Sequence, residues 1–157
     1  FSQALTTFIG QNLGAKEYDR TKKGALFGTI CGIGIAEVIG IAVFFFSPYL
    51  IAAFGGDQKA IEYGIAEAHT IALFYCLLAF SHCMAAIQRG AGRSIVPMFV
   101  MMLVWCGVRV TYISIVIRII PVINVIYWAY PLTWFISSVI FLILFLKTDW
   151  IHGLEKQ

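Results

Sequence analysis

Long apolar runs separated by short polar segments dominate the chain. A helix needs about 20 apolar residues to cross a hydrocarbon core of roughly 30 Å. Four runs meet that length, at residues 24–46, 68–87, 94–117 and 119–146, and residues 1–12 resemble the end of a further span. Glycine and proline, which end helices, lie in the breaks between the runs, at residues 47–57, 89–93 and 118–121. The pattern predicts an all-α integral membrane protein in which residues 1–157 form one membrane domain, with four full transmembrane helices and the end of a fifth.

The composition excludes a soluble globular domain. Hydrophobic residues make up 61% of the 157 residues and charged residues 12%, whereas about a quarter of the residues of a soluble domain are charged. The net charge of +3 gives no indication of nucleic-acid binding. The cysteines all lie in apolar runs without a CxxC pair, so neither a zinc site nor a disulfide framework is expected; they are Cys31, Cys76, Cys83 and Cys106. Because the chain opens at Phe1 without a signal peptide, we expect a fragment.

The distribution of Lys and Arg predicts the orientation in the membrane. Alternating connections carry eight basic residues on one side and two on the other, and cytoplasmic loops are the ones enriched in Lys and Arg. Residues 12–23, residues 89–93 and the tail from Lys147 are therefore predicted to be cytoplasmic, and the region around Asp57, Glu62 and Glu67 external. The eight are Lys16, Arg20, Lys22, Lys23, Arg89, Arg93, Lys147 and Lys156; the two are Lys59 and Arg118.

Small residues recur every four positions in the first full span. Such a stripe lets another helix backbone approach closely, so we interpret it as a packing surface; it consists of Gly24, Gly28, Gly32, Ala36 and Gly40. Glu37 lies about 60° around the helix from Gly40 and should face protein rather than lipid.

Two charges lie within the predicted spans, Glu37 and Arg109. Charged groups inside a membrane are costly and mark candidate functional sites with a partner to be named. The two residues lie at similar depths in spans of the same direction, so we expect them to form an ion pair. A structural pair that joins two helices is the favoured interpretation, and binding of a proton or substrate by Glu37 is the alternative.

A polar and small-residue face predicts a cavity wall in the second full span. Tyr75, Ala79 and His82 fall on one face at helical spacing, so they are candidates for a substrate or coupling cavity. His82 titrates in a range that suits proton coupling, yet a membrane histidine more often forms an interhelical hydrogen bond. His69 lies on another face, so no joint metal site is expected. Pro131 predicts a kink in the last span.

The motifs of common enzyme classes are absent from the sequence. It contains no Walker phosphate loop, HExxH, GxSxG or GxGxxG in a strand context, so we expect neither an enzyme nor a bound cofactor.

Two predicted cytoplasmic connections carry a family resemblance. Residues 10–20 read GQNLGAKEYDR and resemble the "GQNLGAxxYDR" junction after the eighth span of multidrug and toxic compound extrusion transporters. Residues 89–97 read RGAGRSIVP and resemble the "RGxGxSxxP" junction after the tenth span of that family. The chain is thus similar to the ninth to twelfth spans plus the end of the eighth, most of the C-terminal lobe.

The resemblance implies a secondary transporter built of two six-helix lobes. Such proteins export organic cations and amphipathic drugs in exchange for Na⁺ or H⁺. The resemblance further implies the plasma membrane, in a bacterium the inner membrane, as location, and the lipid bilayer and an N-terminal lobe of the same chain as partners. Some relatives carry a carboxylate in the span before the second junction, but residues 68–88 contain no acid, with Leu77, Leu78, Ser81 and His82 in that region.

Two other functions stay open at this stage. A lipid-linked oligosaccharide flippase of the same superfamily should have a cationic cavity, but Arg109 is the single basic residue within the predicted spans. A non-transporting membrane scaffold should lack a polar cavity face. Na⁺ or H⁺ is the expected coupling ion, and no resident metal or nucleic acid is expected.

Overall fold

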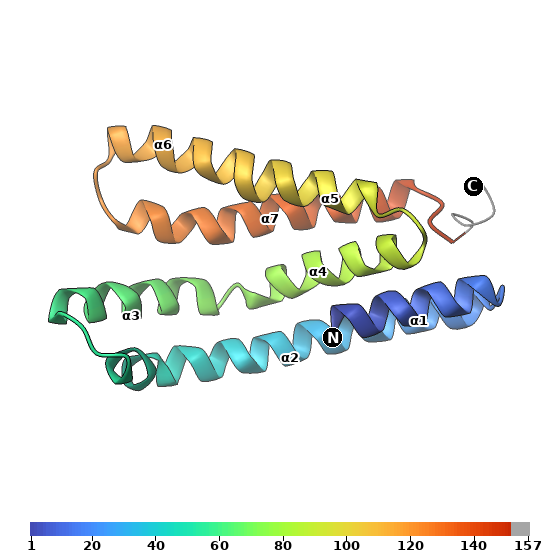
Figure 1. Cartoon of the computed structure of the whole chain (residues 1–157), viewed down its shortest axis with the longest axis horizontal. Coiled ribbons are helices and arrows are strands. Elements are labelled where there is room, and N and C mark those ends of the chain that lie inside the picture. The colour runs from blue at the N-terminus through green and yellow to red at the C-terminus, as the bar shows by residue number, and fades with distance from the viewer. Residues whose placement is uncertain (152–157) are drawn as a thin grey trace.

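The computed structural model describes residues 1–151 and consists of helices (Figure 1). The all-α membrane fold that the sequence predicts is confirmed. Within the described residues no strand occurs. In chain order the elements are α1 (Ser2–Gly14), α2 (Tyr18–Ala53), α3 (Gln58–Ala72), α4 (Tyr75–Gly90), α5 (Ile95–Met101), the π-helical segment η1 (Met102–Val108), α6 (Arg109–Ile119) and α7 (Asn124–Lys147).

Three helical stretches in the described residues are long and apolar enough to cross a membrane. They are α2, the continuous stretch Ile95–Ile119 formed by α5, η1 and α6, and α7, the last of which continues through Pro131. The pair α3 and α4 is a fourth if it counts as one broken span, because the two helices are bent by 58° across a short break. The predicted span 68–87 therefore straddles two helices rather than forming one.

The first full span is longer than its apolar pattern indicates. Residues 24–46 lie inside the 36 residues of α2, which continues through the predicted break at Ser47-Pro48. Proline has no N–H, so Pro48 leaves the carbonyl of Phe44 without its helical donor. The Ser47 hydroxyl donates to that carbonyl at 3.3 Å, which compensates for the missing bond and lets the helix continue.

The outer connections also differ from the predicted boundaries. Gly55 and Gly56 have positive φ angles of 71° and 139° and make the turn after α2, but α3 begins directly after it at Gln58. Most of the segment between the predicted spans 24–46 and 68–87 is thus helical. The last helix begins at Asn124 rather than at 119, because the residues around Pro121 form the connection from α6.

Helix α4 lies at the centre of the bundle. It packs against α1, α2 and α7, and its buried residues form the core together with those of α1 and α7, including Leu5, Ile9, Ala85, Ile87 and Phe141. In Figure 1 the helices form layers, with α1 and α2 on one side of α3 and α4, and α7 followed by the stretch from α5 to α6 on the other.

The basic connections gather at one end of the bundle. The α1–α2 connection, the α4–α5 connection and the end of α7 all lie at the right in Figure 1, and the connections that follow α2 and α6 lie at the opposite end. Arg93 donates from Nη2 to the carbonyl of Asp149 at 3.0 Å, so the α4–α5 connection contacts the segment after α7. Lys156 of the predicted cytoplasmic tail lies outside the described residues.

Candidate substrate cavity

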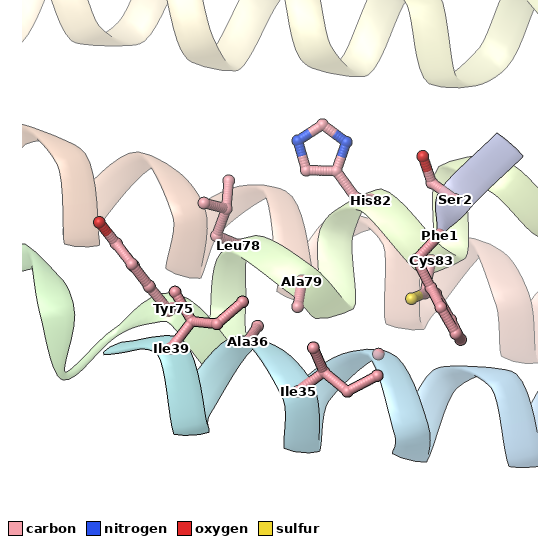
Figure 2. Close-up of a pocket in the computed structure, with 11 residues that line it drawn as sticks. Phe1, Ser2, Ile35, Ala36, Ile39, Tyr75, Leu78, Ala79, His82 and Cys83 are labelled. Carbon is pink, nitrogen blue, oxygen red and sulfur yellow. The ribbon is translucent and has the colours of Figure 1, made fainter. Parts of the chain in front are cut away.

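The three predicted cavity residues line one pocket. Its volume is about 310 Å³, and it lies between α2, α4 and the beginning of α1 (Figure 2). The spacing of Tyr75, Ala79 and His82 on α4 places all three on its wall, as expected for residues on one helical face. Helix α2 supplies the opposite wall with residues Gly32, Ile35, Ala36 and Ile39.

The wall of the pocket is almost entirely apolar. Tyr75 points its hydroxyl away from α2, and His82 extends from α4 away from Ile35 and Ala36 (Figure 2). Clefts of this character suit amphipathic ligands, which combine a large apolar surface with few polar groups. A second cavity of about 450 Å³ between α2, α4 and α7 contains none of the predicted residues.

His69 and His82 each contact an aromatic ring. The ring of His82 meets Trp105 edge to face, with centroids 5.3 Å apart, and within residues 1–151 its side chain forms no hydrogen bond. The structure therefore does not show the interhelical hydrogen bond that the sequence analysis gives as the alternative role of His82. His69 stacks on Phe44 at 4.4 Å and belongs to α3. Residues 1–151 contain no group of three or more His, Cys, Asp or Glu side chains suited to a metal ion.

Glu37 accepts a hydrogen bond from the start of α4. Its Oε2 lies 3.1 Å from the backbone nitrogen of Cys76, the second residue of that helix. The first N–H groups of a helix lack partners within the helix. The residue before α4, Phe74, offers no side-chain cap, so Glu37 caps α4 from a neighbouring helix.

Arg109 lies among residues of α7. Its Nη2 donates to the Thr133 hydroxyl at 2.6 Å, and its guanidinium lies 4.3 Å from the centre of the Tyr130 ring. The centre of the Trp105 ring is 5.9 Å from the guanidinium carbon.

The predicted ion pair between Glu37 and Arg109 is wrong. The two residues have different partners, and helices α3, α4 and α7 lie between α2 and α6 in Figure 1. Similar depth along parallel spans does not make two residues neighbours, since depth says nothing about lateral position.

A serine cluster joins α4 and α7 and was not predicted. Ser81 lies 2.9 Å from Ser137 and 3.0 Å from Ser138, oxygen to oxygen, and all three are buried. Ser138 donates to the carbonyl of Leu77, and the indole N–H of Trp105 donates to Ser137. The available signal was the Ser137-Ser138 pair inside an otherwise apolar run, because buried hydroxyls in membrane helices need a partner.

The stripe of small residues is a packing surface, as predicted. A side chain added at Gly24 or Gly28 would meet Phe8 or Leu5 of α1. One added at Gly32 would meet Cys83 of α4, and one at Gly40 would meet the backbone carbonyl of Ala72. The stripe therefore packs α2 against α1, α3 and α4, and its members Gly32 and Ala36 also line the pocket.

The two junction motifs meet where α1 crosses α4, since a methyl group at Gly10 would lie 3.4 Å from the Gly90 carbonyl oxygen. A methyl group at Gly90 would come within 2.7 Å of the Thr6 carbonyl and of Ile9, and the Thr6 hydroxyl donates to the Ala86 carbonyl at 3.2 Å. Gly90 is required because α1 crosses α4 at backbone contact. The motif residues thus join α1 to the helix that carries the cavity.

Comparison with known proteins identifies the family. The profile of the MatE family matches residues 1–115. The probable multidrug resistance protein NorM of Thermotoga maritima is 29% identical over 99 residues. These residues are 63% of this chain and 21% of that protein, so the chain spans about a fifth of the relative's length in the match. The chain belongs to the MatE family, that of the multidrug and toxic compound extrusion transporters.

Proposed function

We propose that the protein to which this chain belongs is a secondary active exporter of organic cations or other amphipathic drugs. Membership of the MatE family and the name of the NorM relative support transport of such compounds. The observation that carries the proposal is the pocket lined by Tyr75, Ala79 and His82, because its apolar wall suits the large apolar surface of an amphipathic ligand. In this proposal the chain is a transporter and not an enzyme.

The proposal includes exchange for Na⁺ or H⁺. Glu37 is the one carboxylate of α2 between residues 24 and 46, and α4 carries no acid. Because its carboxylate already accepts an N–H of α4, a proton or cation at Glu37 would act on the start of the helix that lines the pocket. No resident cofactor is part of the mechanism.

The proposed setting is the plasma membrane, in a bacterium the inner membrane. The multi-pass membrane fold supports an integral membrane location. The proposed partners are the lipid bilayer, the substrate and an N-terminal lobe of the same chain, without nucleic acid.

Substitution of Ala79 tests the pocket. In vesicles loaded with ethidium, Ala79→Trp in the full-length protein should reduce export strongly, because the indole fills much of a pocket of about 310 Å³. Yield and melting temperature should stay near wild type, since a cavity wall tolerates added volume. Ala42→Trp, at an exposed position of α2, is the matched control and should export normally. Normal export by Ala79→Trp would contradict the proposed pocket.

The coupling ion is tested by imposed gradients. Export should follow an inward Na⁺ gradient, an inward H⁺ gradient or both, and should cease when both are collapsed. His82→Gln, which cannot titrate near neutral pH, should alter the pH dependence only if His82 carries the proton. Export that persists without either gradient would contradict the antiport mechanism.

A further inference from the structure

The second cavity, of about 450 Å³, is a groove between α2 and α7 that we call the α2–α7 groove. It lies at the end of the bundle where α2 begins and α7 ends (Figure 1). Three helices contribute residues three or four positions apart, so one face of each helix meets there. These residues include Lys22, Ala25 and Leu26 of α2, Met84 and Ile87 of α4 and Leu142 of α7. The groove shares no residue with the candidate substrate cavity.

The lining of the groove suits a long apolar chain. Ile87 of α4 is buried, whereas Leu26 of α2 and Leu142 of α7 are 65% and 45% exposed. The Thr29 hydroxyl, which also lines the groove, donates to the Ala25 carbonyl at 2.8 Å and therefore needs no partner from a ligand. Because α2 and α7 are both long and apolar enough to cross a membrane, the acyl tail of a lipid is the apolar chain available at this depth.

A cation lies at the polar end of the groove. Lys22 lines the groove and is exposed, and within residues 1–151 its ammonium group forms no ion pair. A lysine in this position can lay its carbon chain along apolar surface and keep its charge at the membrane–water interface. Trp150, which stacks on Phe145 with centroids 5.1 Å apart, lines the same groove, and tryptophan is enriched at that interface. The groove thus combines an interfacial cation with an apolar channel.

We propose that the α2–α7 groove binds an anionic phospholipid of the cytoplasmic leaflet. One acyl tail lies between α2 and α7, and the phosphate lies beside Lys22. Charge complementarity favours this ligand, because the groove opens at the end of the bundle that carries the basic connections. The cytoplasmic leaflet is rich in anionic lipids, and basic pockets between membrane helices on that side bind their headgroups. The proposal goes beyond the exporter function and does not depend on it.

Two lipids that differ in headgroup charge test the role of Lys22. Native mass spectrometry of the purified full-length protein, titrated with dioleoyl phosphatidylglycerol or dioleoyl phosphatidylcholine, gives the dissociation constant of the first lipid bound. Wild type should bind the anionic lipid about fivefold more tightly, as expected for one lysine beside an anionic headgroup. Lys22→Ala should abolish this preference. Lys23→Ala, the same change at the adjacent exposed residue outside the groove, should keep it.

A matched pair of substitutions in α7 tests the acyl-tail position. Leu142→Trp places an indole in the groove and should weaken binding of both lipids at least about threefold, since even one lost methylene contact costs that much. Ile143→Trp changes the next residue, which is 46% exposed and lies outside the groove, and should leave binding unchanged. Glycerol 3-phosphate, which has the phosphate but no tail, should not displace the lipid.

Each arm can overturn the proposal without affecting the exporter function. Equal preferences in Lys22→Ala and Lys23→Ala overturn the headgroup site, because the attraction would then belong to the whole basic end. Equal lipid binding by Leu142→Trp and Ile143→Trp overturns the acyl-tail site, and displacement by glycerol 3-phosphate overturns a lipid as the ligand. If Leu142→Trp does not fold, Leu26→Trp on the opposite wall replaces it, with the exposed Ile30→Trp as its control.

Discussion

At the scale of single residues, Glu37 shows how a membrane-embedded carboxylate is accommodated. The amino end of a helix carries a partial positive charge and N–H groups without partners, and both favour a negative group. The carboxylate of Glu37 accepts from the second N–H of α4, so its interaction is with a neighbouring helix end rather than with a basic side chain. The break between α3 and α4 creates this site, because only an interrupted span exposes such N–H groups at membrane depth.

The capping role predicts different effects for two substitutions of Glu37. Glu37→Ala removes the acceptor of the Cys76 N–H and should lower the free energy of unfolding by about 1–3 kcal/mol. Glu37→Gln keeps an acceptor oxygen and should cost clearly less. Thermal melting of the purified full-length protein measures both. Equal losses would show that charge, rather than hydrogen bonding, stabilises the start of α4.

A double-mutant cycle tests the separation of Glu37 from Arg109. A buried ion pair would lose about 3–5 kcal/mol when either charge is removed, and the double variant would lose much less than the sum. Because the two residues have separate partners, losses in Glu37→Gln and Arg109→Gln should instead add to within about 0.5 kcal/mol. Unfolding of wild type, the two single variants and the double variant in SDS gives the coupling energy. A large coupling energy would support an ion pair between Glu37 and Arg109.

At the scale of helices, some features follow from the local sequence pattern, whereas others depend on contacts between helices. Apolar periodicity locates the helical runs, and the stripe from Gly24 to Gly40 correctly predicts the packing surface of α2. The break after Ala72 was not predictable in this way, since residues 68–87 contain neither glycine nor proline. The residues that contact this break come from α2. Gly40 leaves space for the Ala72 carbonyl, and Glu37 caps α4. Conversely, Pro48 suggests a break that the Ser47 hydroxyl prevents.

The close contact at Gly40 predicts a destabilising alanine. A methyl group there meets the backbone carbonyl of Ala72, which cannot move without separating α2 from α3, so Gly40→Ala should cost about 1–3 kcal/mol. Gly34 lies in the same helix with nothing within 4 Å of an added methyl group. Gly34→Ala should therefore be neutral or stabilising, by up to about 1 kcal/mol through helix propensity. Melting temperatures distinguish the two, and equal effects would show that the packing surface is loose.

The candidate site combines a face that the sequence reveals with contacts that it does not. Tyr75, Ala79 and His82 lie on one pocket wall because helical spacing fixes a face. The partners of Arg109 come from η1 and α7, and sequence spacing within one helix carries no information on which helix lies beside it. The charge of Arg109 marks it as unusual from sequence alone, whereas the surrounding aromatic rings appear only in the assembled bundle.

At the scale of the whole molecule, the helices sort the charged connections to opposite ends. The connections near Lys16 and Arg89, together with the end of α7, lie at one end of the bundle, and those near Lys59 and Arg118 lie at the other (Figure 1). The Lys and Arg pattern is a property of the sequence alone, and the fold brings the basic connections together at one end. The resulting concentration of positive charge at one end is what orientation in a membrane requires.

The charge asymmetry predicts that the end carrying Asp19 is cytoplasmic and the end carrying Gln58 is external. Both residues are exposed at the start of a helix, so a cysteine at either should be reactive without strain, whereas Gly92 has a positive φ of 79° that disfavours any other residue. The test begins from a full-length variant in which Cys31, Cys76, Cys83 and Cys106 are replaced. An impermeant maleimide added to intact cells should label Gln58→Cys but not Asp19→Cys, and both should react once the cells are permeabilised. Labelling of Asp19→Cys in intact cells would show that the orientation is the opposite of the predicted one. Eight basic residues would then lie on the side to which the positive-inside rule assigns two.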